Sequence, residues 1–164
     1  MAKQSLVIID MQPGFDSAND EATIEKVLEA ITEAKKANLP IVIVECCNDR
    51  YGHTLGEIVA EVDFYEQVYF VEKFDNDGAQ AIEMVLRDND IEVEEHQVCG
   101  VNIGACVHDT IMSLMDDYFR NIVILKEACN CIHIERGTWD GYDDKEGAFN
   151  HWPIYQRPEV SLRG

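Results

Sequence analysis

The chain has 164 residues, with 32 acidic side chains against 13 basic ones and a formal net charge of −19. This length suits one domain with a sizeable core, so we expect a single domain over residues 1–164. The charge argues against nucleic acid and anionic membranes as partners, because both attract basic patches. No apolar run approaches the ~20 residues of a membrane span. The N-terminal residues do not resemble a signal peptide, so we expect a cytoplasmic protein with reduced thiols.

Short apolar runs predict about six strands, which cover residues 5–10, 41–44, 68–71, 97–101, 121–125 and 159–162. Helical spacing of apolar residues predicts helices between them, at about residues 20–36, 54–62 and 78–88 and from residue 106 onward. Asn19 or Asp20 can cap the first of these helices. Strands that alternate with helices indicate an α/β fold, a three-layer α/β/α doubly wound sheet that is mostly parallel.

Three reactive side chains fall at predicted strand ends. Asp10 ends the first strand, Lys73 stands just past the third, and Cys106 follows the fourth. In an open parallel sheet, ligands bind outside the carboxyl ends of the strands. We therefore expect an acid, a cation and a thiol to converge at one sheet edge. Cys106 opens a predicted helix, where backbone N–H groups and the helix dipole favour a thiolate nucleophile.

Other sequence motifs give weaker evidence for a functional site. The chain has no G-x-G-x-x-G, no P-loop lysine pattern and no G-x-S-x-G elbow. Cys129 and Cys131 form a C-x-C pair near His133, which leaves a zinc or redox site open, although no second pair matches it at ligand spacing. A non-catalytic, oligomeric binding or regulatory module also stays open as an alternative to an enzyme.

The three segments at residues 6–15, 71–73 and 100–107 resemble the isochorismatase-like cysteine hydrolases, which include nicotinamidases and N-carbamoyl amidohydrolases. The resemblance covers residues 5–128. It implies hydrolysis of an amide or ureido C–N bond in a small metabolite through a thioester. Cys106 would be the nucleophile, Asp10 the general base and Lys73 the third member of the triad. Lys73 would hold Asp10 ionised and, with the helix N-terminus, lower the pKa of the thiol.

The resemblance also implies an oxyanion hole. In this family a non-proline cis peptide precedes the nucleophile and aims a backbone N–H at the developing oxyanion. Carried over to this chain, that bond joins Val101 to Asn102. The two donors would be the backbone N–H groups of Asn102 and Cys106.

Departures from the family pattern bear on the metal and the substrate. Nicotinamidases carry an Asp-x-His metal pattern after the second strand, and residues 48–53 lack that spacing, so we expect no metal, no cofactor and no nicotinamidase activity. Ile103 stands where a threonine is frequent, and residues 77–79 replace a frequent Ser-Ala-Phe. Cys106 itself argues against hydrolysis of isochorismate, because isochorismatases proper lack the cysteine.

The remaining predictions concern the pocket and the assembly. We expect Phe15, Asn48 and Trp139 to line the substrate pocket, and Arg50 lies in the same loop as Asn48. Family analogy and the aromatic-rich C-terminal region predict a homo-oligomer. The partner at the site is a small-molecule substrate whose identity the sequence leaves open.

Overall fold

The computed structural model describes residues 3–131 and 160–163. Its centre is a six-stranded sheet with the order β3-β2-β1-β4-β5-β6, in which every neighbouring pair is parallel. The strands are β1 (Gln4–Ile9), β2 (Ile41–Cys46), β3 (Val68–Lys73), β4 (Glu95–Val101), β5 (Asn121–Asn130) and β6 (Val160–Arg163). The predicted α/β fold with a parallel sheet is confirmed.

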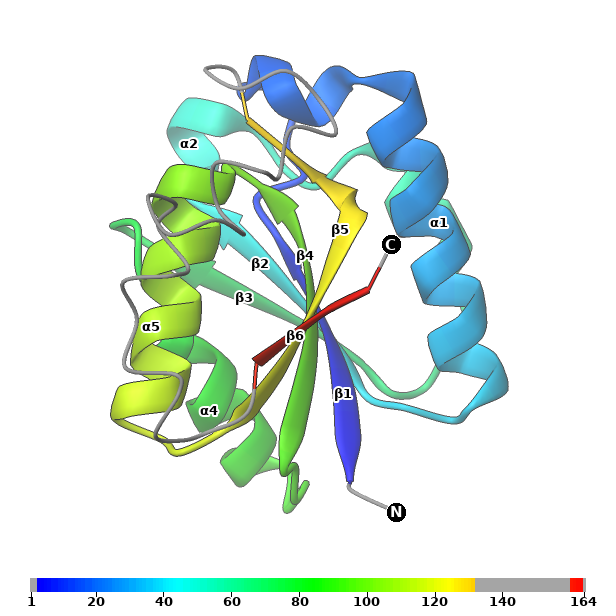
Figure 1. Ribbon diagram of the computed structural model, residues 1–164. Coiled ribbons are helices and arrows are strands. Elements are labelled where there is room, and N and C mark those ends of the chain that lie inside the picture. The colour runs from blue at the N-terminus through cyan, green and yellow to red at the C-terminus, as the bar shows by residue number, and fades with distance from the viewer. Residues whose placement is uncertain (1–2, 132–159, 164) are drawn as a thin grey trace.

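Helices cover both faces of this sheet (Figure 1). On one face α1 (Glu21–Lys36) packs against β1, β4 and β5 and contacts α3 (Gly56–Val62). On the other face lie α4 (Ala79–Asp88) and α5 (His108–Asp116), which contact each other. A single turn, α2 (Asn48–Tyr51), interrupts the loop predicted after β2. Within the described ranges, no helix has the length and apolarity needed to cross a membrane.

Burial explains why the apolar runs form strands. Residues 5–9 of β1 and all of β2 are buried, as expected for strands with helices on both sides. The edge strand β3 is only partly buried. Asp20 caps α1 by accepting a hydrogen bond of 2.8 Å from the Thr23 backbone N–H, which selects one of the two predicted caps.

The strand order reverses its direction between β1 and β4. From β1 the chain runs outward through β2 to β3, then crosses back to β4 on the other side of β1. Loops that leave β1 and β4 therefore diverge at their carboxyl ends, where open α/β sheets bind ligands. Asp10 and Cys106 follow these two strands.

Three predicted boundaries were wrong. Lys73 is the last residue of β3 rather than a loop residue, and β5 continues to Asn130, past the polar Lys126 and Glu127 that end the apolar run. Its register against β4 shifts between Val98 and Gly100. A π-helical turn (Ile103–Val107) precedes α5, so Cys106 lies before that helix rather than at its start. Such a turn leaves no mark in helical periodicity.

A buried polar network ties α4 to the amino-terminal ends of β1 and β4. His96 is fully buried; its Nε2 lies 2.9 Å from Glu83 Oε1 and its Nδ1 lies 2.6 Å from Ser5 Oγ. Arg120 donates to both Glu83 oxygens, at 2.8 and 2.6 Å. Burial alone would raise the pKa of Glu83, but the hydrogen bonds from Arg120 and His96 lower that pKa to about 2.

This shift predicts a pH-dependent contribution to stability. Glu83 ionises at lower pH in the folded chain than in the unfolded chain, so its contribution is present above about pH 4.5 and is lost as the pH falls toward 2. The difference in free energy of unfolding between wild type and Glu83→Gln should shrink by about 2–3 kcal/mol between pH 6 and pH 2. Urea unfolding at several pH values measures it. Glu33→Gln, at an exposed position, is the matched control, and a pH-independent Glu83→Gln difference would contradict the assignment.

Candidate active site

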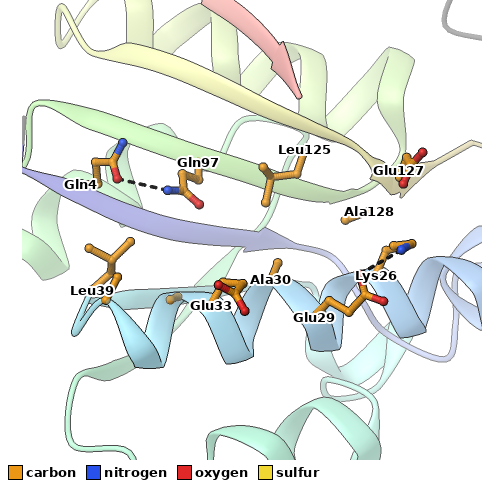
Figure 2. Close-up of a pocket in the computed structure, with 12 residues that line it drawn as sticks. Gln4, Lys26, Glu29, Ala30, Glu33, Leu39, Gln97, Leu125, Glu127 and Ala128 are labelled. Carbon is orange, nitrogen blue, oxygen red and sulfur yellow. Dashed lines mark hydrogen bonds and ion pairs between the residues drawn. The ribbon is translucent and has the colours of Figure 1, made fainter. Parts of the chain in front are cut away.

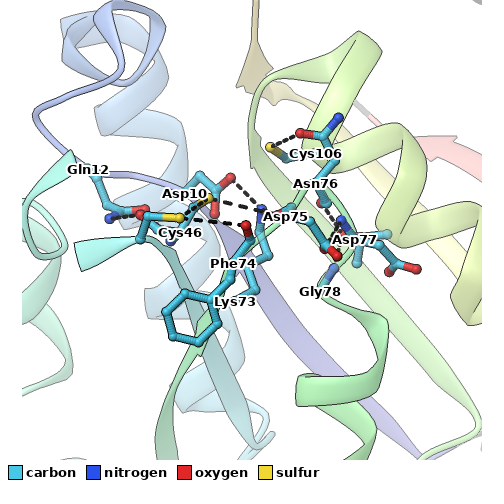
Figure 3. A network of polar contacts seen from close by, with 12 residues as sticks. Asp10, Gln12, Cys46, Lys73, Phe74, Asp75, Asn76, Asp77, Gly78 and Cys106 are labelled. Atoms are coloured by element: carbon cyan, nitrogen blue, oxygen red, sulfur yellow. Dashed lines mark hydrogen bonds and ion pairs between the residues drawn. The ribbon is translucent and has the colours of Figure 1, made fainter. Parts of the chain in front are cut away.

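The structure brings Asp10, Lys73 and Cys106 together at the carboxyl edge of the sheet (Figure 3). All three are buried, with at most 5% of their surface exposed. Lys73 Nζ lies 3.0 Å from Asp10 Oδ2. The Cys106 thiol interacts with the same carboxylate and with Lys73. An acid, a cation and a thiol therefore share one buried site.

The backbone aims Asp10 into this site. Its φ is +55°, a left-handed conformation that Asp tolerates better than most residues. Its N–H donates to Val44 O and its carbonyl accepts from Gln12 N–H, at 2.9 and 2.8 Å. The carboxylate oxygens thus lie near Lys73 and the thiol and receive no hydrogen bonds from backbone N–H groups of the described residues.

Burial sets the protonation of the site. It raises the pKa of Asp10, against the opposing effect of the Lys73 charge. Burial is the largest single influence on Lys73 and would lower its pKa, but the charge and hydrogen bond of Asp10, together with Cys106 and Cys46, raise that pKa, so Lys73 stays cationic. Burial and the charge of Asp10 together raise the pKa of Cys106 to about 12, although Lys73 opposes them. The resting sulfur is a thiol.

This result corrects the expectation that Lys73 and the helix N-terminus would lower the pKa of Cys106. Cys106 lies inside the π-helical turn and is 5% exposed, so desolvation of a thiolate outweighs the neighbouring cation. Asp10 lies on the same side as Lys73 and cancels much of its charge. A thiolate at this position requires removal of the thiol proton.

The segment between β4 and Cys106 is held from several sides. Its Val101–Asn102 peptide bond is cis. The Asn102 carbonyl accepts from the N–H groups of Ala105 and Val107, both at 3.1 Å, which closes the π-helical turn. The candidate donors, the backbone N–H groups of Asn102 and Cys106, lie at the beginning and inside of this turn. Their role toward an oxyanion stays a prediction.

Two residues that the sequence did not single out fix this segment. Ser17 hydrogen-bonds the Asn102 side chain through its hydroxyl, and Asn130 Nδ2 donates to Ser17 O at 3.0 Å. Gly100, in β4, has φ +116°, and a Cβ there would come within 2.0 Å of Ile9 O. Only glycine allows β1 and β4 to approach at this point.

Gln12 joins the loops after β1 and β2. Its side chain is fully buried and both accepts from Cys46 N–H, at 2.7 Å, and donates to Cys46 O, at 3.0 Å. It also donates to Gly52 O at 2.5 Å. Cys46 ends β2 beside the ion pair; burial, with Asp10 and the adjoining Cys47 thiol, raises its pKa to about 11 against the effect of Lys73. The site therefore contains a second, protonated thiol.

The predicted pocket residues have different surroundings. Phe15 stacks on Tyr51, with ring centroids 4.3 Å apart, and the Arg50 guanidinium lies 5.0 Å above the Tyr51 ring. Asn48 donates its backbone N–H to Glu72 at 3.0 Å, while its buried Oδ1 has no hydrogen-bond partner among the described residues. These contacts place Phe15 and Asn48 in the two joined loops. Trp139 lies outside the described residues.

The other cysteines and histidines do not form a metal cluster in the part of the chain that the structure describes. His53 lies 3.4 Å from Glu45, and His108 lies 2.9 Å from Asp109. All six cysteines are free thiols. Cys129 is buried, and burial raises its pKa to about 12, so it has the character of a core thiol. His133 falls outside the described ranges.

Figure 2 shows a hollow of about 410 Å³ between α1 and strands β1, β4 and β5. It is lined by Lys26 and several acidic and small side chains, and does not include Asp10, Lys73 or Cys106. This hollow lies along the helix-covered face rather than at the carboxyl edge of the sheet. The buried triad and this hollow are separate features.

The thiol assignment makes an unusual prediction. Asp10→Asn removes a negative charge that raises the pKa of Cys106 and leaves Lys73 in place. Iodoacetamide should therefore alkylate Cys106 faster in Asp10→Asn than in wild type at pH 8, by about three- to tenfold for each unit by which the pKa falls, because the thiolate fraction rises while the nucleophilicity of the thiolate declines. Peptide mapping by mass spectrometry separates Cys106 from Cys46 and Cys47. Asp88→Asn, on the exposed end of α4, should change nothing; an unchanged or slower rate in Asp10→Asn would contradict the assignment.

Comparison with known proteins places this geometry in context. A family model described as the isochorismatase domain matches residues 4–139. Comparison with curated protein sequences finds no match.

Solved structures share the fold at low sequence identity. The nicotinamidase from Staphylococcus aureus is 17% identical, with a TM-score of 0.73 over 98% of this chain and 100% of that one. The MAR1 ribonuclease from Caenorhabditis elegans is 18% identical, with a TM-score of 0.75 over 98% and 77%. The N-carbamoylsarcosine amidase from Thermoplasma acidophilum is 18% identical, with a TM-score of 0.71 over 98% and 95%.

Proposed function

The chain belongs to the isochorismatase family, and from this premise we propose that it is a cysteine hydrolase that cleaves an amide or ureido C–N bond in a small metabolite. The observation that carries the proposal is the convergence of Asp10, Lys73 and Cys106 in one buried site, where Lys73 Nζ lies 3.0 Å from Asp10 Oδ2. An acid, a thiol and a fixed cation at one sheet edge are the parts that acyl transfer through a thioester needs. We treat the whole chain as one hydrolase domain.

The first half of the reaction uses the proton of Cys106. As the sulfur attacks the substrate carbonyl carbon, the thiol proton passes to Asp10, which burial makes a stronger base by raising its pKa above the ordinary value. The carbonyl oxygen becomes an oxyanion, which the N–H groups of Asn102 and Cys106 would stabilise. Asp10 then gives its proton to the leaving nitrogen. The C–N bond breaks, and the acyl group remains on Cys106 as a thioester.

The second half releases the acid. Asp10, again ionised, takes a proton from water as that water attacks the thioester carbonyl. The C–S bond breaks, the sulfur recovers the proton from Asp10, and the product forms as a carboxylic acid, which gives its remaining proton to bulk water and leaves as a carboxylate. Lys73 holds Asp10 in place through both halves and keeps its charged form accessible despite burial.

The names of two proteins with the same fold support the proposed substrate class. A nicotinamidase and an N-carbamoylsarcosine amidase both act on C–N bonds next to a carbonyl, which supports an amide or ureido substrate. A ribonuclease also shares the fold, but a net charge of −19 opposes binding of a polyanion. We therefore favour a small molecule over RNA.

Loss of the nucleophile tests this proposal. Cys106→Ala and Asp10→Asn should each lower kcat/KM by at least about 10³-fold in a panel of nicotinamide, benzamide and N-carbamoyl amino acids, measured by ammonia release. Cys47→Ala removes a more exposed thiol outside the triad and should retain wild-type rates. Mass spectrometry of acid-quenched enzyme should reveal the acyl adduct on Cys106. Absence of wild-type turnover across the panel would instead favour the non-catalytic binding module.

We also propose that the protein is a homo-oligomer. Several large apolar side chains are exposed, among them Phe64, Phe70, Phe74 and Phe119, and β3 is an edge strand of the sheet. Such surface favours association. Light scattering coupled to size-exclusion chromatography should give at least twice the 18.6 kDa chain mass, and a mass of one chain at micromolar concentration would refute the proposal.

A further inference from the structure

The loop that joins β3 to α4, residues 74–78, connects the two halves of the site (Figure 3). At one end Lys73 Nζ donates to Asp75 O at 2.8 Å. One residue further, Asn76 Oδ1 lies 3.7 Å from Cys106 Sγ, within hydrogen-bond range for sulfur. The loop thus contacts both the cation and the nucleophile of the triad.

Hydrogen bonds to α5 fix the position of this loop. Gly78 N–H donates to Thr110 Oγ1 at 2.9 Å, and the Thr110 hydroxyl lies 3.4 Å from Asn76 O. Ser113 hydrogen-bonds Asp77 from the same helix. A Cβ at Gly78 would lie 3.1 Å from Lys73 Cδ, so the chain passes close to the lysine stem. The main chain of Asn76 is therefore placed before any ligand arrives.

The side chain of Asn76 differs from its main chain. It is exposed to solvent, and among the described residues the Cys106 thiol is its hydrogen-bond partner. A thiol is a weak donor, so this contact contributes little to folding. An exposed amide that the main chain holds beside a reactive sulfur is free to exchange that partner for a ligand.

We propose that Asn76 is a specificity residue that accepts a hydrogen bond from the leaving-group N–H and so selects amides and ureido compounds over esters. This inference rests on the proposed function. When the thiol proton moves to Asp10 and the S–C bond forms, Asn76 Oδ1 loses its S–H donor. The leaving nitrogen is bonded to the carbon that the sulfur attacks, so its N–H lies near enough to replace that donor.

The leaving nitrogen must accept a proton and can donate an N–H, and the site offers a partner for each. In the tetrahedral intermediate the nitrogen has a lone pair, which takes the proton held by Asp10, and at least one N–H when the substrate is a primary or secondary amide. Asn76 Oδ1 lies 3.7 Å from the Cys106 sulfur and can meet the N–H, while Asp10, in the same buried site, can deliver the proton. The C–N bond then breaks, and the amine leaves with the proton that began on sulfur. An ester oxygen has no hydrogen to donate, and its lone pairs would face Asn76 Oδ1.

Matched amide and ester substrates test the inference. The probes are nicotinamide with methyl nicotinate and benzamide with methyl benzoate, and the pair with the faster amide is used. Asn76→Leu keeps the size of the side chain and removes its polar atoms. It should lower kcat/KM for the amide by about 10- to 100-fold and for the ester by less than threefold. Asn76→Asp retains an acceptor oxygen and should keep the amide-to-ester ratio within about threefold of wild type.

Controls separate this inference from the proposed function. Asn89→Leu, at the exposed end of α4, should leave both rates unchanged. Equal losses for amide and ester in Asn76→Leu would overturn the specificity role while the hydrolase assignment stands. A wild-type enzyme that hydrolyses neither these pairs nor any N-carbamoyl amino acid of the panel above would overturn the proposed function, and the role of Asn76 with it. Circular dichroism verifies that each variant is folded.

Discussion

The ion pair between Asp10 and Lys73 is the constraint on which the site depends. Taking two charges out of water costs several kcal/mol for each ion, and a separation of 3.0 Å offsets this cost only while both partners remain. Asp10 follows β1 and Lys73 ends β3, so the pair spans the end of β2, which lies between them. Cys46 ends β2, and its thiol therefore feels both charges. The pair links three strands at the edge where chemistry is expected.

This constraint also determines what state the nucleophile occupies at rest. A lysine without Asp10 would stabilise a thiolate, but here the carboxylate cancels that effect and burial favours the neutral thiol. The proton therefore remains on the sulfur until a substrate binds. The Cys106 sulfur should therefore react readily only with a carbonyl compound bound in the site. An alkylating reagent from solution meets a protonated thiol, which is a poor nucleophile. A sulfur that is protonated at rest is also less prone to react with the other thiols of a protein that has six free cysteines.

Most of the fold and the identities of the three central residues were predictable from the sequence. Buried parallel strands produce uninterrupted apolar runs, and their carboxyl ends meet at one edge, so Asp10, Lys73 and Cys106 could be placed together. The pKa of Cys106 could not be predicted, because it depends on how far the turn buries the sulfur. Gln12, Ser17, Asn130 and Asn76 act through contacts between distant loops and leave no periodic pattern. These contacts can be recognised only from the interatomic distances in the structure.

The acidic surface near the site has a consequence for turnover. Glu72, Asp75 and Asp77 are exposed around the loop that leads from Lys73 toward Cys106, and the chain as a whole carries −19. A neutral amide enters such a field without penalty, whereas the carboxylate that hydrolysis generates is repelled by it. The field would therefore favour departure of the acid over its return. The same charge that opposes the binding of polyanions would limit inhibition by the product.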